Sequence, residues 1–369
     1  MPISVLMVGG FLGAGKTTTI ARLARELISE GRRVGIVTND QAEDLVDTAF
    51  LRSQGFGVGE VAGACFCCKF NDLTDVLDQL AASETPDVIL TEPVGSCTDL
   101  VATVLEPLAA LAGDRFAPAP LAVLLKPEHG RKILGGKQVG FSPKAAYIFR
   151  KQLEEATLVV VNKADTLSPP ERDELEQLLR TEYPEKRVLT MSARTGEGWS
   201  EFRQALASVG GRRAAPIEVD YGVYAEGEAE LGWLNAVLRF SSSPWQLDDL
   251  AVGAVRSFAE RLRAASLEPV HVKVLAEAKG ENGTVESMAN LVASDASVEL
   301  SLASHASSPS ARLIVNARVA GPPEVLESIL HATAAELAAR GGGRVTCERL
   351  DRFRPSPPVP THRYGTSER

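Results

Sequence analysis

Two hydrophobic patterns alternate in the N-terminal part of the chain. Residues 4–10 (SVLMVGG) form an unbroken apolar run that ends in glycines, which is typical of a strand buried on both faces of a parallel sheet. Apolar side chains then recur at helical spacing from Ile20 to Leu27, and Gly31 follows them, so we predict a helix that ends at this glycine. A second apolar run, residues 33–40, predicts the next buried strand.

The same rhythm continues through the first half of the chain. Helical stretches at 70–83 and 169–183 alternate with short apolar runs at 87–92, 121–126, 157–165 and 187–193. Strands that alternate with helices pair in parallel. We therefore predict an α/β fold with a parallel sheet covered by helices.

The pattern changes after a cluster of small residues at 208–217 (SVGGRRAAPI), which we interpret as a linker. Beyond it, strand patterns and helical patterns indicate a smaller α+β domain in the order strand-helix-strand-strand-helix-strand. The strand patterns cover 233–240, 270–277, 297–303 and 310–319, and the helical patterns cover 247–264 and 322–339. The predicted division is a first domain at 1–207, the linker, the second domain at 218–351 and a proline-rich tail at 352–369, whose composition favours an extended chain laid on another surface.

Length and composition narrow the class of protein. A chain of 369 residues with 44% hydrophobic residues is too long for a single core and can bury two. The formal charge of -9, without a block of Lys or Arg, argues against a nucleic-acid partner. We found no apolar run long enough for a membrane span and no secretory signal at the N-terminus, so we expect a cytoplasmic protein without a membrane partner.

A phosphate-binding loop connects the first predicted strand and helix. The stretch GFLGAGKT, which starts at Gly10, matches the pattern G-x-x-x-x-G-K-[ST]. Gly10, Gly13 and Gly15 let the backbone turn and aim N–H groups at phosphate oxygens. Lys16 would bridge the β- and γ-phosphates, and the Thr17 hydroxyl would bind Mg2+. The residues assigned to the nucleotide here are Gly10, Gly13, Ala14, Gly15, Lys16, Thr17 and Thr18.

A second motif, NKAD, follows a predicted strand and points to guanine. The Asp165 carboxylate can accept from the ring N–H and the exocyclic amine of guanine, whereas adenine has an acceptor in place of the ring donor. We therefore predict GTP rather than ATP as the nucleotide. Asn162 would hold neighbouring loops, and the Lys163 stem could lie on the base. Ser192 and Ala193, after the next strand, would offer backbone to the guanine oxygen.

Two acidic residues lie at the ends of other predicted strands. Asp40 would approach the γ-phosphate side, and Glu92 occupies the place of the metal-side acid of phosphate-loop enzymes. Gly95 could give its N–H to the γ-phosphate. Together with Lys16 these three residues form the predicted catalytic set, and Thr17 with Glu92 the predicted Mg2+ ligands. Either acid could instead cap a loop.

Three of the five cysteines lie within four positions. In an extended segment Cys65 and Cys67 share a face, and Cys68 joins them only if the chain turns. Two thiolates are half of a tetrahedral zinc site. The other ligands could be Cys68, a carboxylate such as Glu43 or Asp47, or a group from a partner molecule.

Other roles for these cysteines stay open. Cys65 and Cys68 have the C-x-x-C spacing of redox thiols, and a buried cysteine often serves only as a small apolar side chain. We expect the two remaining cysteines, Cys97 and Cys347, to be packing residues.

The motifs GGFLGAGKTTT, GACFCC, EPVG and NKAD, in this order, resemble those of the CobW-type GTPases of the SIMIBI group, over about the first 200 residues. The resemblance implies that Cys65, Cys67 and Cys68 bind a transition metal between the nucleotide switches. It also implies that Glu92 and Gly95 serve Mg2+ and the γ-phosphate. Departures are Ala64 in place of a second glycine and Pro93 in place of a small hydroxyl residue.

The expected function is that of a GTPase that binds Zn2+, or Co2+ or Ni2+, and releases it to a client metalloprotein or metal-requiring pathway when GTP is hydrolysed. GTP and Mg2+ would order the segment from Asp40 to Asp47 and the region of Cys65. We expect a monomer or a nucleotide-dependent homodimer. The alternatives are a GTP-gated interaction protein, in which the cysteines are structural or redox groups, and a phosphotransferase that acts on a small acceptor.

Overall fold

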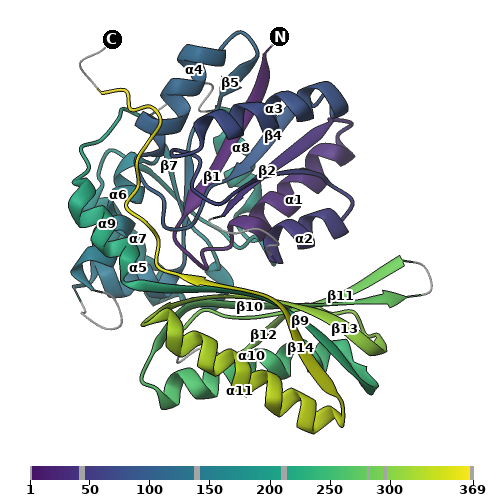
Figure 1. Cartoon of the computed structure of the whole chain (residues 1–369). Helices are drawn as coiled ribbons and strands as arrows, with labels where there is room; N and C mark the ends of the chain where they lie inside the picture. Colours follow the sequence, from purple (N-terminus) through teal and green to yellow (C-terminus); the bar gives the residue numbers. More distant parts are fainter. Residues whose placement is uncertain are drawn as a thin grey trace. The chain divides into compact units, whose positions relative to one another are not determined.

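Contacts divide the chain into two compact units, which are described separately (Figure 1). Unit 1 comprises Met1–Glu43, Gln54–Gly227 and Pro357–Arg369, and unit 2 comprises Asp44–Ser53 and Glu228–Ser356. This computed structural model describes residues 2–40, 46–136, 142–208, 214–280, 283–293 and 297–365. The predicted linker at 208–217 falls largely on residues 209–213, outside the described ranges. By contacts, the change of unit comes later, between Gly227 and Glu228.

Unit 1 is built on a parallel sheet, as the sequence predicts. Its strands lie in the order β3-β2-β4-β1-β6-β7-β8, and β5 also pairs with β1. Their bounds are β1 (Ile3–Gly10), β2 (Val34–Asp40), β3 (Gly57–Ala62), β4 (Val88–Glu92), β5 (Phe116–Pro118), β6 (Ala122–Leu125), β7 (Leu158–Val161) and β8 (Arg187–Thr190). The sequence analysis missed β3 and β5, because β3 is interrupted by glycine and only half-buried, and β5 has three residues.

Helices connect these strands. They are α1 (Lys16–Ser29), α3 (Phe70–Glu84), the π-helical turn η1 (Val101–Leu105), α4 (Glu106–Ala112), α5 (Pro127–Leu134), α6 (Pro143–Glu155), the 3-10 turn η2 (Ala164–Thr166), α7 (Pro169–Glu182), α8 (Trp199–Ser208) and α9 (Tyr221–Ala229). Their ends follow local sequence: α7 begins with prolines after a capping box between Ser168 and Glu171. The helix after the phosphate loop ends before Gly31, whose φ of 81° requires the left-handed region.

The parallel pairing brings the carboxyl ends of the strands to one edge of the sheet. β1 pairs with β4 and β6, β2 with β4, and β7 with β6 and β8, all in parallel. In folds of this kind, ligands bind outside that edge. Gly10, Asp40, Glu92 and Asn162 end or directly follow these strands, so the predicted site residues share one edge.

Unit 2 is an antiparallel sheet with helices. The strand order is β12-β11-β10-β13-β9-β14. The elements are β9 (Leu231–Gln246), α10 (Leu247–Ala264), β10 (Glu268–Gly280), β11 (Gly283–Leu291), β12 (Glu299–Leu302), β13 (Ser307–Ala320), α11 (Pro323–Gly341) and β14 (Arg344–Phe353). The predicted α+β class is confirmed. The predicted strand ranges include neither β11 nor β14, although the predicted order ended in a strand after the second helix. No helix in the described ranges is long and apolar enough to cross a membrane.

The two faces of this second sheet carry separate cores. Every second side chain of β10 and β13, for example Val274 and Val315, packs with α10 and α11 in a large cluster. The side chains between them, including Leu275 and Ile314, pack against Val46. Because successive side chains of a strand point to opposite faces, the second cluster lies on the face away from α10 and α11. The helix on that face is α2 (Val46–Ser53).

Polar contacts hold α2 on this sheet. The backbone N–H of Val46, which has no partner inside the helix, donates to Asn316 Oδ1 at 3.0 Å. Lys273 forms an ion pair with Asp47. Asp47, one of the carboxylates considered as a metal ligand, is therefore engaged with a lysine of β10. The segment between two strands of unit 1 thus contributes a helix to unit 2.

We predict that Asn316→Ala loosens α2 without unfolding unit 2. The substitution leaves the buried Val46 N–H without its acceptor, which costs about 1–3 kcal/mol. Hydrogen exchange followed by mass spectrometry should then show faster exchange in residues 46–53 than in wild type. Ser308→Ala, on the same strand, is the control and should leave exchange in α2 unchanged. Equal protection of α2 in both variants would contradict the role of Asn316.

Candidate functional site

The phosphate loop is shaped by backbone that requires glycine. Gly10, Gly13 and Gly15 have φ values of 126°, 76° and 89°, which side-chain-bearing residues rarely adopt. A Cβ on Gly10 would lie 2.1 Å from the carbonyl oxygen of Leu124. A Cβ on Gly15 would lie 2.5 Å from Asn162 Nδ2. The loop therefore lies directly against β6 and the motif after β7, with α1 beginning at Lys16.

Oxygen ligands of the kind that Mg2+ prefers lie together at the start of α1. The Thr17 hydroxyl donates to Glu92 Oε1 at 3.0 Å, and both residues are buried. Hydroxyl and carboxylate oxygens suit a hard divalent cation. Lys16 is close as well, because a Cβ on Gly95 would lie 3.0 Å from its Nζ. The predicted pair Thr17 and Glu92 and the predicted pair Lys16 and Gly95 are thus neighbours in the structure.

The loop after β4, residues 93–100, is fixed by two buried side chains of α6. Gln152 Nε2 donates to the carbonyl oxygens of Gly95 and Cys97, at 3.0 and 2.8 Å. Glu155 accepts from the Thr98 hydroxyl at 3.0 Å and from the Val101 N–H at 3.1 Å. These side chains satisfy backbone groups that water does not reach, which a buried loop requires.

Glu155 is a carboxyl group without access to water. Burial raises its pKa to about 8, and the nearby charge of Asp99 acts in the same direction, while the hydrogen bonds from Val101 and Thr98 oppose the change. Below that pH the group is therefore mainly the neutral acid.

Asn162 connects the two nucleotide motifs. Its Nδ2 donates to the Ala14 carbonyl oxygen of the phosphate loop at 2.8 Å. Its Oδ1 accepts from the N–H of Ala193 at 3.0 Å. One buried amide thus holds the phosphate loop beside the loop that follows β8, as we expected from the sequence.

The rest of the NKAD motif has features of a binding site. Lys163 has a φ of 62°, a conformation that costs a lysine about 1–3 kcal/mol and that is common at functional sites. Asp165 Oδ2 accepts from Arg194. In the described part of the chain, the buried Oδ1 of Asp165 has no hydrogen-bond partner. A buried carboxylate oxygen of this kind suits a ligand that brings two N–H donors.

The backbone N–H groups after β8 have partners within the chain. The N–H of Ser192 donates to the Glu197 carbonyl at 2.8 Å, and the N–H of Ala193 donates to Asn162 Oδ1 at 3.0 Å. That Ser192 and Ala193 offer backbone to a guanine oxygen stays a prediction.

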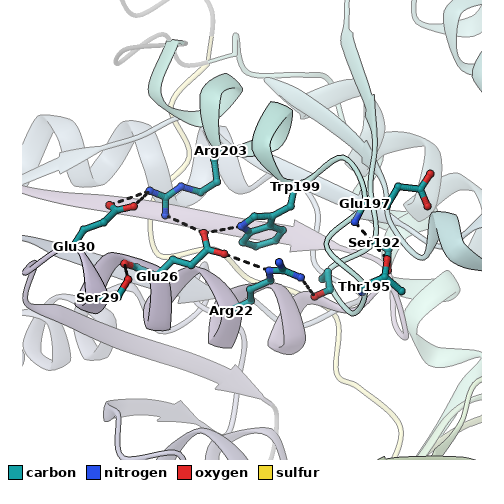
Figure 2. Close-up of polar contacts among 10 residues, drawn as sticks. Arg22, Glu26, Ser29, Glu30, Ser192, Thr195, Glu197, Trp199 and Arg203 are labelled. Atoms are coloured by element: carbon teal, nitrogen blue, oxygen red, sulfur yellow. Dashed lines mark hydrogen bonds and ion pairs between the residues drawn. The ribbon is translucent and has the colours of Figure 1, made fainter.

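A polar network joins α1 to the loop after β8 (Figure 2). Arg22 donates to the Ala193 carbonyl at 3.0 Å, and its guanidinium lies 4.7 Å from the centre of the Trp199 ring. Glu26 accepts from the Trp199 indole N–H at 2.7 Å. It also forms an ion pair with Arg203, with 3.7 Å between the guanidinium nitrogen and the carboxylate oxygen. The helix that starts at the phosphate loop thereby holds the loop after β8 in place.

The three clustered cysteines lie on a turn between β3 and α3. The N–H groups of Cys68 and Lys69 both donate to the Cys65 carbonyl at 3.0 Å. The turn brings all three sulfur atoms within 4.8 Å of one another. The Sγ distances are 2.8 Å for Cys65 to Cys67, 3.3 Å for Cys65 to Cys68 and 3.8 Å for Cys67 to Cys68. The condition set by the sequence, that the chain turns at Cys68, is met.

Asn39 builds this turn, and the sequence analysis missed it. Its Nδ2 donates to the carbonyls of Val61 and Ala64, both at 2.8 Å, and its Oδ1 accepts from the Phe66 N–H at 2.8 Å. The carbonyl of the next residue, Asp40, accepts from the Gly63 N–H at 3.1 Å. The end of β2 therefore carries the cysteine loop. Glu43, the other predicted ligand, lies outside the described residues.

A fourth cysteine, Cys97, lies near Cys65 but outside the group of three sulfur atoms that lie within 4.8 Å of one another. Hydrogen bonds between Cys65 and Cys67, Cys68 and Cys97 hold the pKa of Cys65 well below that of an ordinary thiol. The hydrogen bond to Cys65 is also the main reason why the pKa of Cys67 is raised and that of Cys68 rises to about 11. The cluster thus favours one thiolate surrounded by thiol donors.

Cys97 is accordingly more than the packing residue that we predicted, although it is buried. Cys347 is exposed on β14, so its predicted packing role is wrong.

Comparisons with known proteins match a family model. The model of the CobW/HypB/UreG nucleotide-binding domain matches residues 4–190. The chain is 30% identical over 195 residues to the zinc chaperone CobW of Pseudomonas aeruginosa, covering 45% of this chain and 50% of that protein. It is 30% identical over 178 residues to the zinc chaperone YeiR of Escherichia coli, covering 46% and 49%. The match spans about half the length of these relatives. A solved structure, Zn(II)-bound YjiA GTPase from E. coli, is 16% identical with a TM-score of 0.38, covering 91% of this chain and 99% of that one.

Glu155→Gln should change how stability depends on pH. The ordinary carboxyl pKa is 4.5 and the folded value is about 8, so between these values the folded protein holds a proton that the unfolded chain releases. Wild-type stability should therefore fall by up to about 1.4 kcal/mol per pH unit across this window. Glutamine does not titrate and lacks this loss.

The measurement is the urea midpoint of unfolding from pH 5 to pH 9. The difference between Glu155→Gln and wild type should move in favour of the variant as pH rises. Glu154→Gln, at a half-exposed neighbouring position, is the control. Parallel pH profiles for all three proteins would contradict a raised pKa at Glu155.

Proposed function

Because the chain belongs to the CobW/HypB/UreG nucleotide-binding domain family, we propose that it is a GTPase that binds a transition metal at its cysteine cluster. Hydrolysis of GTP to GDP and phosphate would lower the affinity for the metal and release it to a client. The metal is cargo in this proposal. Zn2+ is the first choice, with Co2+ and Ni2+ as further cargoes.

The observation that carries the proposal is the loop of residues 93–100. Gly95 lies against Lys16, the residue expected to contact the γ-phosphate. Two residues later, the Cys97 thiol contacts Cys65. A nucleotide-dependent shift at Gly95 would therefore move the Cys97 sulfur, which is a neighbour of the cluster. The nucleotide side and the sulfur atoms are therefore connected by a short stretch of backbone, which α6 holds by hydrogen bonds.

On the nucleotide side, each residue has a distinct role. Thr17 and Glu92 would hold Mg2+, which supplies positive charge against the phosphates. Lys16 and the N–H groups of the phosphate loop would bind phosphate oxygens, and Asp165 would select guanine. Asp40 would lie on the γ-phosphate side.

On the metal side, the donor set is soft. Thiolates favour Zn2+, and they also accept Co2+ or Ni2+. Cys65, Cys67 and Cys68 form the predicted set, and Cys97 is a candidate fourth sulfur. Binding requires loss of the protons on Cys67 and Cys68, so uptake would release protons.

The coupling that this mechanism needs is modest. A hundredfold change of metal affinity between nucleotide states corresponds to about 2.7 kcal/mol. Couplings between sites are typically about 1–3 kcal/mol. A client metalloprotein would receive the metal, and the protein would act as a monomer or as a homodimer formed with nucleotide.

Asp165→Asn should weaken GTP binding about 10^2- to 10^4-fold. The carboxylate would accept two hydrogen bonds from guanine, each worth about 1.5–3 kcal/mol to a charged acceptor. Isothermal titration with GTP gives the affinity. Asp173→Asn, an exposed position on α7, should bind GTP like wild type. Unchanged GTP affinity in the Asp165 variant would rule out the base assignment.

The metal prediction concerns the cysteines. Competition with a chromophoric chelator should show tight Zn2+ binding that weakens when GTP is replaced by GDP. Cys65→Ser combined with Cys67→Ser should abolish this binding, whereas Cys347→Ser, at an exposed cysteine, should not. If the double variant keeps both its Zn2+ affinity and GTP hydrolysis, the GTP-gated interaction protein is the better reading.

A further inference from the structure

The C-terminal part of unit 1 lies on the cysteine turn. Residues 357–364, here called the cover segment, are extended and form neither helix nor strand (Figure 1). The N–H of Thr361 donates to the Cys67 carbonyl at 2.8 Å, and its hydroxyl donates to the Cys68 carbonyl at 3.0 Å. The N–H of Val359 donates to Cys68 Sγ at 3.3 Å. The surface on which this part of the predicted extended tail lies is therefore the cysteine turn.

The cover segment is fastened at a second place. Arg363 Nε donates to Oδ2 of the buried Asp99 at 2.8 Å, and its NH2 donates to the Ile217 carbonyl at 2.9 Å. The N–H of Tyr364 donates to the Ala102 carbonyl at 2.9 Å. Asp99 belongs to the loop that carries Gly95 and Cys97. The cover segment thus contacts both the cysteine turn and the loop that approaches Lys16.

An aromatic contact fills the space between these attachments. The His362 ring lies perpendicular to Phe70 with centroids 5.1 Å apart, and it stacks on Tyr364 at 6.5 Å. Phe70 is the first residue of α3 and directly follows the cysteine turn. The cover segment therefore continues over the start of this helix.

The sequence of the cover segment directs one donor at the sulfur. Pro357, Pro358 and Pro360 have no backbone N–H and favour an extended chain. Val359 stands among them with the single N–H of this stretch, and that N–H meets Cys68 Sγ. Hydrogen bonds to metal ligands from outside the ligand set orient those ligands and tune their affinity.

We propose that the cover segment is part of the metal site: the Val359 N–H positions the Cys68 thiolate, and the segment must lift before metal passes to a client. The proposal rests on the proposed function and deepens it. Val359 is a positioning residue, because it acts through Cys68. The Arg363–Asp99 pair sets how readily the cover segment lifts.

The test of the positioning role is a matched pair of variants in the full-length protein. Val359→Pro removes the N–H and suits the extended backbone, and Val359→Ala keeps the N–H. With Co2+ bound, Val359→Pro should shift the sulfur-to-cobalt charge-transfer band to longer wavelength, because the thiolate loses a donor. Val359→Ala should keep the wild-type band. Zn2+ transfer to a chelator should be about tenfold faster in Val359→Pro only.

The test of the cover needs no metal. In metal-free protein, Arg363→Ala should speed the reaction of Cys68 with a bulky thiol reagent, read by mass spectrometry, and Arg363→Lys should restore most of the protection. Arg349→Ala, which removes an Arg–Asp pair of unit 2, is the control and should react like wild type.

The outcomes separate the two proposals. If wild type itself shows no thiolate-to-cobalt band, the proposed function fails, and the metal role of the cover segment fails with it. If wild type binds Co2+ and both Val359 variants share its band and its transfer rate, the positioning role of Val359 is overturned. Equal thiol reactivity of Arg363→Ala and wild type overturns the cover.

Discussion

The buried loop after β4 is the constraint on which the rest of unit 1 depends. A loop in such a place needs partners for its backbone groups, and α6 supplies them through Gln152 and Glu155. Because both side chains are buried, their hydrogen bonds hold the backbone of this loop against α6. The same helix also contacts the phosphate loop, because the Phe149 ring packs edge-on against Phe11 with centroids 6.1 Å apart.

Three residues of this loop reach three different parts of the unit. Gly95 lies against Lys16, Cys97 meets Cys65, and Asp99 receives Arg363. Each contact depends on the residue type. Gly95 has no side chain to displace Lys16, Cys97 provides a sulfur, and Asp99 provides a carboxylate. Since the backbone between them is short, a displacement at one position would also move the others.

The sequence alone was sufficient to predict features that depend on residues adjacent in the chain. The phosphate loop, the NKAD motif and the parallel sheet were predicted because glycine spacing and apolar runs are local signals. Asn39, Cys97 and Arg363 were not, because each acts on a segment far away in the chain and has no motif of its own. The strands β11 and β14 were also missed, because the buried half of β11 contains the polar residues Ser287 and Asn290, and β14 has no buried residue.

The helix α2 has a consequence for how the protein can be divided. It is encoded between two strands of the first sheet, yet its apolar side, with Val46 and Phe50, is covered by residues of the second. A fragment that ends at residue 227 would contain this helix without the residues that cover its apolar side. We expect such a fragment to aggregate. Separating the two units would therefore require a change in the sequence of α2.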